Sequence, residues 1–451
     1  MSKILFLQNS ARELEGLMSI SSYISRNGHQ SKMLIEGYGN LETTLETYRP
    51  DVVGLHVLTK DHDWAKEKCK EIKKLSPGTV TLLGGAHPTH YPRIGLEEGV
   101  DGICIGEGEK MTRYILDSIE NNEDWKDSNS LYYAQNGVLV KNSLDSWLSA
   151  EEIPIPDRSL YRGVEGIRDN ADLQIMSSRG CPYTCNFCGN WGIKNLFGST
   201  RVRLKSPENV IKEIKDAKER GKIDTIHFQD DMFGLQEQWL NDFSKMYKAE
   251  IENPFYVLLR CDSVTEKLIY TLKDMGCYEV GIGIESGNER IRNEILGKRL
   301  KTETILKAAE ILKKSGMRFH TFSMFGLPEE TLENSFETID LNIKIQPTVA
   351  YTQMFHPYPG TKFFTAETEP HIIGANFDLF SHNFPYTEDT PRIQRLQKLA
   401  MMAVEFPSVR PFLQGMIELP LEEGQFEEVA KEFWEKIYHK RLKNKNKHLE
   451  N

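Results

Sequence analysis

Three cysteines lie within eight residues, at Cys181, Cys185 and Cys188, in the stretch "SSRGCPYTCNFCGNW". A closed structural zinc site takes four protein ligands, usually as two separated pairs. Iron–sulfur clusters also normally take four cysteine ligands. No histidine or cysteine follows Cys188 until His227. Zinc is therefore the weaker alternative, and the triplet favours an iron–sulfur cluster with one open iron, which is what a reactive metal site provides.

The spacing Cys-x-x-x-Cys-x-x-Cys, with Phe187 before the third cysteine, resembles the signature of radical S-adenosylmethionine enzymes. The resemblance implies that these cysteines hold a [4Fe-4S] cluster and that S-adenosylmethionine chelates its open iron. In that family an electron from the cluster breaks a carbon–sulfur bond, and the resulting radical abstracts hydrogen from an unactivated carbon. The cofactors carry that chemistry, and the protein positions the substrate. We expect one cluster, with Cys261 and Cys277 as small buried residues.

Later segments resemble the S-adenosylmethionine contacts of the same family. In "FQDDMFG" an acidic residue would accept the methionine ammonium, because that cation needs an anionic partner in a dry site. Asp230 and Asp231 are the candidates; since a strand alternates sides, only one points inward, and capping of the next helix is the alternative. "GIGIESGNERIRNEILGK" implies a ribose contact, "FSMFGLPEET" implies adenine contacts, and Arg260 is either a carboxylate partner or a core-rim residue. The candidates are Phe187, Gly189, Asp230, Asp231, Arg260, Glu285, Ser286, Phe325 and Gly326.

The elements around these segments alternate between strands and helices. From residue 172 to residue 360, six apolar runs of strand length alternate with amphipathic segments of helical period. Such units close into a barrel or part of one, with functional residues on the loops after the strands. The sequence therefore predicts a partial (β/α)6 barrel, followed at 361–451 by a small helical region.

The first part of the chain predicts a separate α/β domain. Short buried runs such as "KILFLQ" and "VTLLGG" alternate with amphipathic segments over about residues 2–122, which is typical of a doubly wound, Rossmann-like sheet. Asn136-Gly137 marks a β-hairpin. Prolines and acidic residues at about 148–163 mark a linker. We therefore predict an α/β domain at 1–145, a linker at 146–171 and the barrel at 172–360.

This arrangement resembles the cobalamin-binding subfamily of the radical enzymes. The matching segments, "LLGGAHPTHYP" and "ICIGEGEK", follow predicted strands, and an open α/β sheet binds ligands at the carboxyl ends of its strands. The Asp-x-His-x-x-Gly motif of other cobalamin folds is not in the sequence, but the subfamily commonly binds cobalamin without a histidine on cobalt. His56, His87 and His90 are alternative ligands, although a loop histidine more often forms hydrogen bonds. The cobalamin candidates are Ser10, Thr59, Gly84, Gly85, His87, Pro88, Thr89, Gly106, Glu107 and Gly108.

Charge and composition limit the partners. The formal net charge of −10 would repel phosphates, so a nucleic-acid partner is not expected, and the basic run at 439–448 is interpreted as a solvated tail. No run approaches the ~18 apolar residues of a membrane span, and the N-terminus does not resemble a signal peptide. Seven cysteines without a paired pattern suit reduced thiols. We expect a cytoplasmic protein.

The resemblance implies an enzyme that methylates an unactivated carbon of a small-molecule or lipid-like substrate, supplied with electrons by a flavodoxin or ferredoxin. The alternative keeps both cofactors but uses the radical for cyclisation, oxidation or rearrangement, as in the anaerobic tetrapyrrole cyclase. Methylthiolation is disfavoured because it calls for a second cluster. A cobalamin or redox sensor without turnover is the least favoured function.

Overall fold

The computed structural model describes residues 1–164, 172–375, 384, 386–420, 423–433 and 435. By internal contacts the chain forms two compact units. The first unit comprises Met1–Val257 and Pro357–Asn376, and the second comprises Leu258–His356 and Phe377–Asn451. The predicted basic tail and residues 165–171 of the predicted linker lie outside the described residues. Among the described helices, none combines the length and the apolar character that a membrane crossing requires.

The first unit begins with a sheet whose parallel strands follow the order β2-β1-β3-β4-β5. This is one of the two common doubly wound orders, and the predicted α/β domain is confirmed. Two antiparallel strands, β6 and β7, extend the β5 edge. The bounds are β1 (Lys3–Gln8), β2 (Gln30–Ile35), β3 (Val52–His56), β4 (Val80–Gly84), β5 (Gly102–Cys104), β6 (Leu131–Gln135) and β7 (Val138–Lys141).

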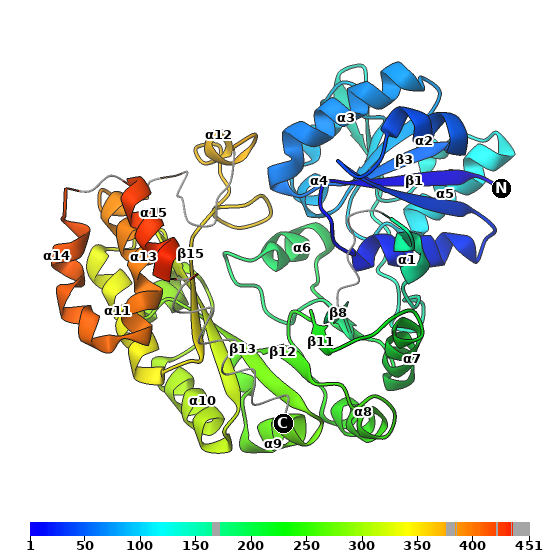
Figure 1. Ribbon diagram of the computed structural model, residues 1–451. Coiled ribbons are helices and arrows are strands. Elements are labelled where there is room, and N and C mark those ends of the chain that lie inside the picture. Colours follow the sequence, from blue (N-terminus) through cyan, green and yellow to red (C-terminus); the bar gives the residue numbers. More distant parts are fainter. Residues whose placement is uncertain (165–171, 376–383, 385, 421–422, 434, 436–451) are drawn as a thin grey trace. The chain divides into compact units, whose positions relative to one another are not determined.

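Helices cover both faces of this sheet (Figure 1). Because side chains alternate along a strand, Ile4 and Phe6 of β1 pack with α1 (Glu15–Ser25) and α5 (Glu109–Asn121), while Leu5 and Leu7 face the opposite side. There they pack with α2 (Leu41–Tyr48) and α3 (His62–Leu75). The short helix α4 (Ala86–His90) follows β4. The loops that follow the parallel strands lie together at the carboxyl edge of the sheet.

The predicted hairpin and linker had different outcomes. Asn136 and Gly137 both have positive φ, 52° and 76°, as a type I′ turn requires, so the hairpin is confirmed. The predicted linker is packed rather than extended where it is described, because Leu148 and Tyr161 are buried. The Tyr161 hydroxyl donates to Gln8 Oε1 at 2.6 Å and accepts from the Leu14 amide at 3.1 Å. Proline and acidic content alone does not reveal such packing.

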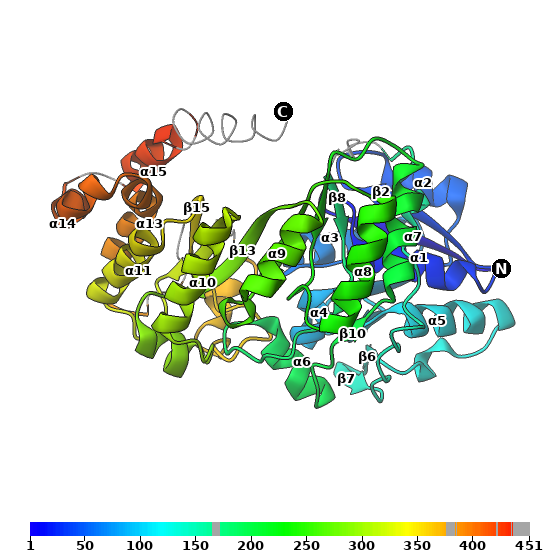
Figure 2. The same ribbon diagram turned by 90° about the horizontal axis from the view of Figure 1, so that it is seen from below.

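The first unit also contains the start of the predicted barrel. Strands β8 (Asp172–Ile175), β11 (Thr225–Phe228) and β12 (Phe255–Leu259) pair in that order as parallel neighbours. Helices α7 (Pro207–Lys218) and α8 (Glu237–Glu250) lie side by side (Figure 2). A short antiparallel ladder joins β9 (Ser178–Arg179) to β10 (Arg203–Leu204). It closes residues 180–202, which contain the three cysteines and a helix that the sequence did not predict, α6 (Gly189–Phe197).

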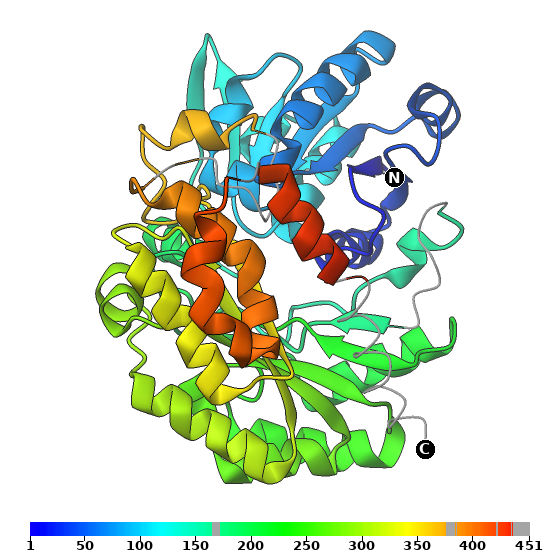
Figure 3. The ribbon, with the colours of Figure 1, turned by 60° about the vertical axis from the view of Figure 1, so that its left-hand side comes forward.

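The second unit holds three parallel strands, β13 (Cys277–Glu285), β14 (Arg318–Phe325) and β15 (Val349–Met354), paired in that order. With them, all six predicted barrel strands are present. Helices α9 (Glu266–Asp274), α10 (Thr302–Ser315) and α11 (Leu332–Ile345) connect or follow them. The predicted helical C-terminal region is confirmed in α13 (Thr390–Glu405), α14 (Leu413–Ile417) and α15 (Glu423–Glu432). Figure 3 shows α13, in orange, beside the yellow α11.

One segment after β15 belongs to the first unit. Residues 357–376, with the short helix α12 (Glu369–Ile372), are grouped with the α/β domain. The Lys362 amide donates to the Asn186 carbonyl within the cysteine loop at 2.8 Å. A Cβ atom on Gly360 would lie 2.4 Å from the His90 ring. Residues 357–376 therefore contact both the α/β domain, at His90, and the cysteine loop, at Asn186.

Candidate functional site

The cysteine loop is shaped by a tight turn and a helix start. Gly180 has a φ of 91°, and a Cβ there would lie 2.7 Å from the Arg201 carbonyl oxygen, so glycine suits this position. The Cys188 amide donates to the Cys185 carbonyl at 3.0 Å, and Cys188 is the N-cap residue of α6. A helix N-terminus favours negative charge. The Asn190 backbone amide at this helix start lowers the pKa of the third thiol, which partly offsets the effect of burial.

The thiols nevertheless lie in a partly desolvated place. Burial raises the pKa of Cys181 to about 11, and burial also raises the pKa of Cys188. Iron binds thiolates, so cluster assembly must release these protons. Within the described residues, no three His, Cys, Asp or Glu side chains surround a single-ion position. A four-iron cluster binds each cysteine through a different iron, so three thiols and one open side fit such a cluster without converging on one point.

The two adjacent aspartates occupy different environments. Asp230 is fully buried and accepts hydrogen bonds from the Ser177 amide at 3.0 Å, from the Ser177 hydroxyl at 2.7 Å and from the Ser178 hydroxyl. Its carboxylate therefore braces the segment that leads into the cysteine loop. Asp231 is exposed, and its Oδ2 accepts a hydrogen bond from the side-chain Nδ2 of Asn190 at 3.3 Å. Its charge contributes to the raised pKa of both Cys181 and Cys188, so Asp231 is the aspartate that faces the thiols.

Glu285 is held in an unusual conformation in the second unit. Its φ is 63°, and the pairing of β13 with β14 shifts register between Gly283 and Glu285. Its Oε1 accepts from Lys298 Nζ at 2.6 Å. A Cβ on Gly283 would lie 2.3 Å from that carboxylate oxygen, so a larger residue there would displace the Glu285 carboxylate. Non-glycine residues held at positive φ cluster at functional sites, which favours Glu285 as a ligand contact.

The loop after Glu285 depends on a residue that sequence reasoning missed. Arg292 is fully buried, and its guanidinium donates to the Ser286 carbonyl at 2.6 Å and to the Leu300 carbonyl at 2.7 Å. It lies in a π-helical turn, Ile291–Ile295. The stretch "NERIRNE" gave no signal of this, because a charged side chain in a polar stretch is usually exposed.

Two other candidates in this unit have structural contacts. Arg260 pairs with Asp262 at 2.9 Å and also donates to the Lys298 carbonyl. It therefore helps to hold the lysine that pairs with Glu285. The Phe325 side chain is fully buried in the cluster formed with α11 and α13, and its predicted contact with adenine stays a prediction. The main chain at Phe325 and Gly326, whose φ is 71°, remains a candidate.

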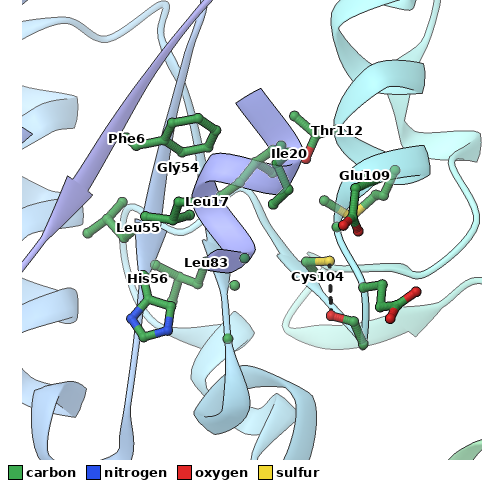
Figure 4. Close-up of a pocket in the computed structure, with 18 of the residues that line it drawn as sticks. Phe6, Leu17, Ile20, Gly54, Leu55, His56, Leu83, Cys104, Glu109 and Thr112 are labelled. Carbon is green, nitrogen blue, oxygen red and sulfur yellow. Dashed lines mark hydrogen bonds between the residues drawn. The ribbon is translucent and has the colours of Figure 1, made fainter. Parts of the chain in front are cut away.

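A cavity of about 280 Å³ lies between the α/β sheet and helices α1 and α5. Figure 4 shows Phe6 and Gly54 on the strand side, Thr112 and Glu109 on the α5 side, and Ile20 of α1 between them. Its lining is mainly apolar side chains and glycines, with charged residues at Glu15, Glu107, Glu109 and Arg179. The lining also includes His56, Gly85 and Gly106, which lie at the carboxyl ends of β3, β4 and β5.

The predicted cobalamin residues divide into two groups. Gly84, Gly85, Gly106, Glu107 and Gly108 line the cavity. The Thr89 hydroxyl joins the two glycine loops, because it donates to the Gly85 carbonyl at 2.8 Å and accepts from the Gly106 amide at 3.1 Å. The candidates outside the lining are Ser10, Thr59, His87, Pro88 and Thr89. The lining residues that sequence reasoning did not name include Phe6, Ile20, Gly54, Cys104 and Thr112.

The three candidate histidines lie at the end of β3 and in α4, and burial favours their uncharged form near neutral pH. Burial lowers the pKa of His56 and His90 to about 4, and that of His87 to about 3. His87 Nε2 lies 2.9 Å from His62 Nδ1, and His90 fits against Gly360. Of the three, only His56 lines the cavity.

The size of the cavity decides what part of a cobalamin it fits. Pockets for whole ligands span about 300–1,000 Å³, so a space of about 280 Å³ is too small for a corrin with its nucleotide. Its apolar walls and glycines suit a flat heteroaromatic group, such as the base at the end of the cobalamin tail. The residues present therefore fit cobalamin in part: the lining at Gly54, Gly84 and Gly106 would accommodate such a flat group of the cofactor.

Comparisons with known proteins identify two domains in the chain. Residues 175–341 match the radical SAM superfamily, and residues 16–116 match the B12 binding domain. An uncharacterized methyltransferase of Pyrococcus horikoshii is 29% identical over 359 residues, which cover 77% of this chain and 76% of that protein. The anaerobic magnesium-protoporphyrin IX monomethyl ester cyclase of Rubrivivax gelatinosus is 22% identical over 384 residues, covering 81% and 67%.

A solved structure shares the fold. The radical S-adenosylmethionine methyltransferase TsrM of Kitasatospora setae, determined with cobalamin and a [4Fe-4S] cluster bound, superimposes with a TM-score of 0.67. The match covers 80% of this chain and 74% of that one, at 18% identity. At that identity the similarity extends to the fold and not to individual residues.

Proposed function

Since the chain belongs to the radical S-adenosylmethionine superfamily and carries a B12-binding domain, we propose that it is a cobalamin-dependent methyltransferase. It uses one [4Fe-4S] cluster and S-adenosylmethionine to methylate an unactivated carbon of a small-molecule or lipid-like substrate. When bound, these cofactors supply a transferable methyl group and a carbon-centred radical. A reduced flavodoxin or ferredoxin supplies the electron. The cytoplasmic location stays a prediction.

One observation carries the proposal: the cavity and the cysteine loop are parts of the same compact unit and lie directly against each other. Arg179 lines the cavity and lies two positions before Cys181. Phe197, in the helix that follows the cysteines, packs directly on Gly106 of the cavity wall. A methyl donor held at the strand ends would therefore lie beside the loop where the radical is generated.

In this proposal the residues of the chain bind and orient the cluster and S-adenosylmethionine. Cys181, Cys185 and Cys188 hold the cluster, with Phe187 and Gly189 beside it. Asp231 accepts the methionine ammonium, and Asp230 fixes the approach to the loop through its serine partners. In the second unit, Glu285 would contact the ribose, supported by Lys298, and Ser286 and the main chain at Gly326 are the other residues proposed for the nucleoside.

The test is to identify what the enzyme makes from S-adenosylmethionine. Anaerobically reconstituted full-length protein, loaded with cobalamin and given methyl-labelled S-adenosylmethionine and a reductant, should form S-adenosylhomocysteine and 5′-deoxyadenosine together. One product reports methyl donation and the other reports radical formation. Cys188→Ala should abolish 5′-deoxyadenosine. Once the substrate is found by comparing metabolites and lipids with and without the gene, label should reach it.

The cyclase or rearrangement function is the second candidate, because the similarity to the magnesium-protoporphyrin cyclase spans 81% of this chain. It predicts 5′-deoxyadenosine without S-adenosylhomocysteine during turnover of the true substrate. That result would replace the methyltransferase proposal. Formation of neither product above background would favour a sensor.

A further inference from the structure

Two arginines stand at the two ends of the cysteine loop. Arg179 and Arg203 are paired positions in the β9–β10 ladder. Every residue from 180 to 202, including all three cysteines and α6, is enclosed between them. Whatever holds these two arginines therefore also fixes the base of the loop that carries the cluster ligands.

Both arginines donate to the same carboxylate, that of Glu107. Arg203 forms a bidentate pair with it, at 2.9 Å from Nη1 and 2.7 Å from Nη2. Arg179 Nη1 lies 3.0 Å from Glu107 Oε1. Its Nη2 donates to Glu109 Oε1 at 2.9 Å and to the Ser19 hydroxyl at 2.8 Å. We call Arg179, Arg203, Glu107 and Glu109 the charge clamp.

The clamp is largely shielded from water, so its contacts are weakly screened. The exposed fractions of its side chains are 13% for Arg179, 7% for Arg203, 19% for Glu107 and 3% for Glu109. Burial raises the pKa of Glu107, but the hydrogen bond from Arg203 and the charges of both arginines outweigh it, and the net pKa is below its ordinary value. Glu107 is therefore an anion held by two cations.

The same residues form part of the cavity wall. Glu107, Glu109 and Arg179 line the cavity, together with Gly106 and Gly108. Gly106 also contacts the cysteine loop directly: Phe197 packs so closely against it that a Cβ there would lie 2.6 Å from Phe197 Cζ. A ligand that orders residues 106–109 therefore acts on groups that are bonded to both ends of the cysteine loop.

We propose that Glu107 is a positioning residue that couples the cobalamin cavity to the cluster loop. Cobalamin in the cavity fixes the 106–109 loop and, through the charge clamp, the loop that carries the cysteines. By thermodynamic reciprocity, an assembled cluster tightens cobalamin binding by the same factor. This inference rests on the proposed function, because it requires that cobalamin binds at the cavity.

The coupling is measured on full-length protein. The dissociation constant of cobalamin is determined for the chain with its cluster reconstituted and for the iron-free chain. In the unchanged protein we expect cobalamin to bind more tightly with the cluster, within the range of about 5-fold to 150-fold that is typical of coupled sites. Glu107→Gln keeps the size of the side chain but removes its charge, and should bring the ratio close to one. Arg203→Lys, which keeps a single charge, should give an intermediate ratio.

Electron paramagnetic resonance of the reduced cluster gives a second readout. Addition of cobalamin should shift the cluster signal in the unchanged protein and leave it unshifted in Glu107→Gln. A purely structural role of Glu107 would change the iron content or the melting temperature without this selective loss of the shift.

Glu213 provides a matched control. Its carboxylate is also buried between two cations, 3.1 Å from Arg158 Nη2 and 3.0 Å from Lys205 Nζ, but Glu213 does not line the cavity. Glu213→Gln should leave the ratio unchanged even if it lowers the melting temperature.

Three outcomes overturn the inference. They are a ratio of one in the unchanged protein, a full ratio in both Glu107→Gln and Arg203→Lys, and an equal loss in Glu213→Gln. If the unchanged protein binds no cobalamin in either state, the proposed function fails and the inference fails with it. If cobalamin binds but the ratio is one, the inference alone fails.

Discussion

The cysteine loop and the cavity are neighbours in the first unit, but they are built in opposite ways. The loop presents side chains that form bonds, namely three thiols and that of Asn190, which donates to the carboxylate of Asp231 after β11. The cavity is formed largely where side chains are small or missing, at Gly54, Gly84 and Gly106, between apolar walls. A site of the first kind can be recognised in the sequence from residue types and spacing. A site of the second kind can be recognised only in the structure, where the topology brings distant glycines together.

The largest expected effect tests the loop side of this comparison. Ala at Cys181, Cys185 or Cys188 should reduce the iron content from about four per chain to nearly none, because each thiolate binds a different iron. Iron analysis and visible absorption after anaerobic reconstitution measure this. Cys261→Ala and Cys277→Ala, at buried cysteines elsewhere, should retain the iron. Zinc at the loop after strictly anaerobic reconstitution would contradict the cluster assignment.

The next effect concerns the support under the loop and depends on pH. Burial raises the pKa of Asp230 to about 6, despite hydrogen bonds from Ser178 and Ser177. Because the folded pKa lies above the unfolded value, the contribution of Asp230 to stability is fully present below pH ~3.9 and is lost as the pH rises through about 6.

Relative to Asp230→Asn, the free energy of unfolding of the unchanged protein should therefore fall by about 2 kcal/mol between pH 4 and pH 7. Urea unfolding of the iron-free full chain measures it. A difference between the two proteins that is constant over this range would show that Asp230 titrates normally.

The cavity side of the comparison is tested by filling the space. A Cβ on Gly54 already lies 3.3 Å from Ile4 Cδ1, and a valine there suits a strand while occupying the cavity. Gly54→Val should raise the dissociation constant of cobalamin at least about tenfold, or 1.4 kcal/mol, with no change in iron content. Gly78→Val, where nothing lies within 4 Å of the added Cβ, should bind normally. Unchanged binding in Gly54→Val would place cobalamin elsewhere.

The smallest effect separates the two neighbouring aspartates. Asp231→Asn should weaken S-adenosylmethionine binding by about fivefold, since a hydrogen bond to a charged group contributes roughly 1 kcal/mol when partly exposed. Equilibrium binding to the reconstituted enzyme measures it. Asp224→Asn makes the same change at the opposite end of β11, where Asp224 pairs with Lys222, and should bind normally. A loss in Asp224→Asn of equal size would point to a general charge effect.

Local patterns predicted the elements well. The apolar run "KILFLQ" is strand β1, and Asn136-Gly137 forms the predicted turn between β6 and β7. Both features depend on residues that are adjacent in sequence. The resemblance to the radical enzymes, first made on three cysteines, is confirmed by the family match to residues 175–341. The assignments of individual site residues stay predictions.

What sequence did not predict depends on contacts between distant residues. Glu107 meets Arg203 across 96 positions, and Phe197 meets Gly106 across almost as many. The linker looked open because proline and acidic residues are common in tethers, yet Arg158 is buried there against Glu213. Contacts of this kind leave no periodic pattern and no compositional bias in the sequence near either residue, so only the folded chain reveals them.

The return of residues 357–376 to the first unit has a consequence for how the protein is made. Residues 258–356, which belong to the second unit, leave the ribosome before Gly360 can meet His90 and before the Lys362 amide can meet the Asn186 carbonyl. At translation rates of about 5–20 residues per second, this delay is about 5–20 seconds. During that interval the cysteine loop has emerged without one of its packing partners. The nascent enzyme thus completes the surroundings of its cluster loop only after most of its second unit has been synthesised.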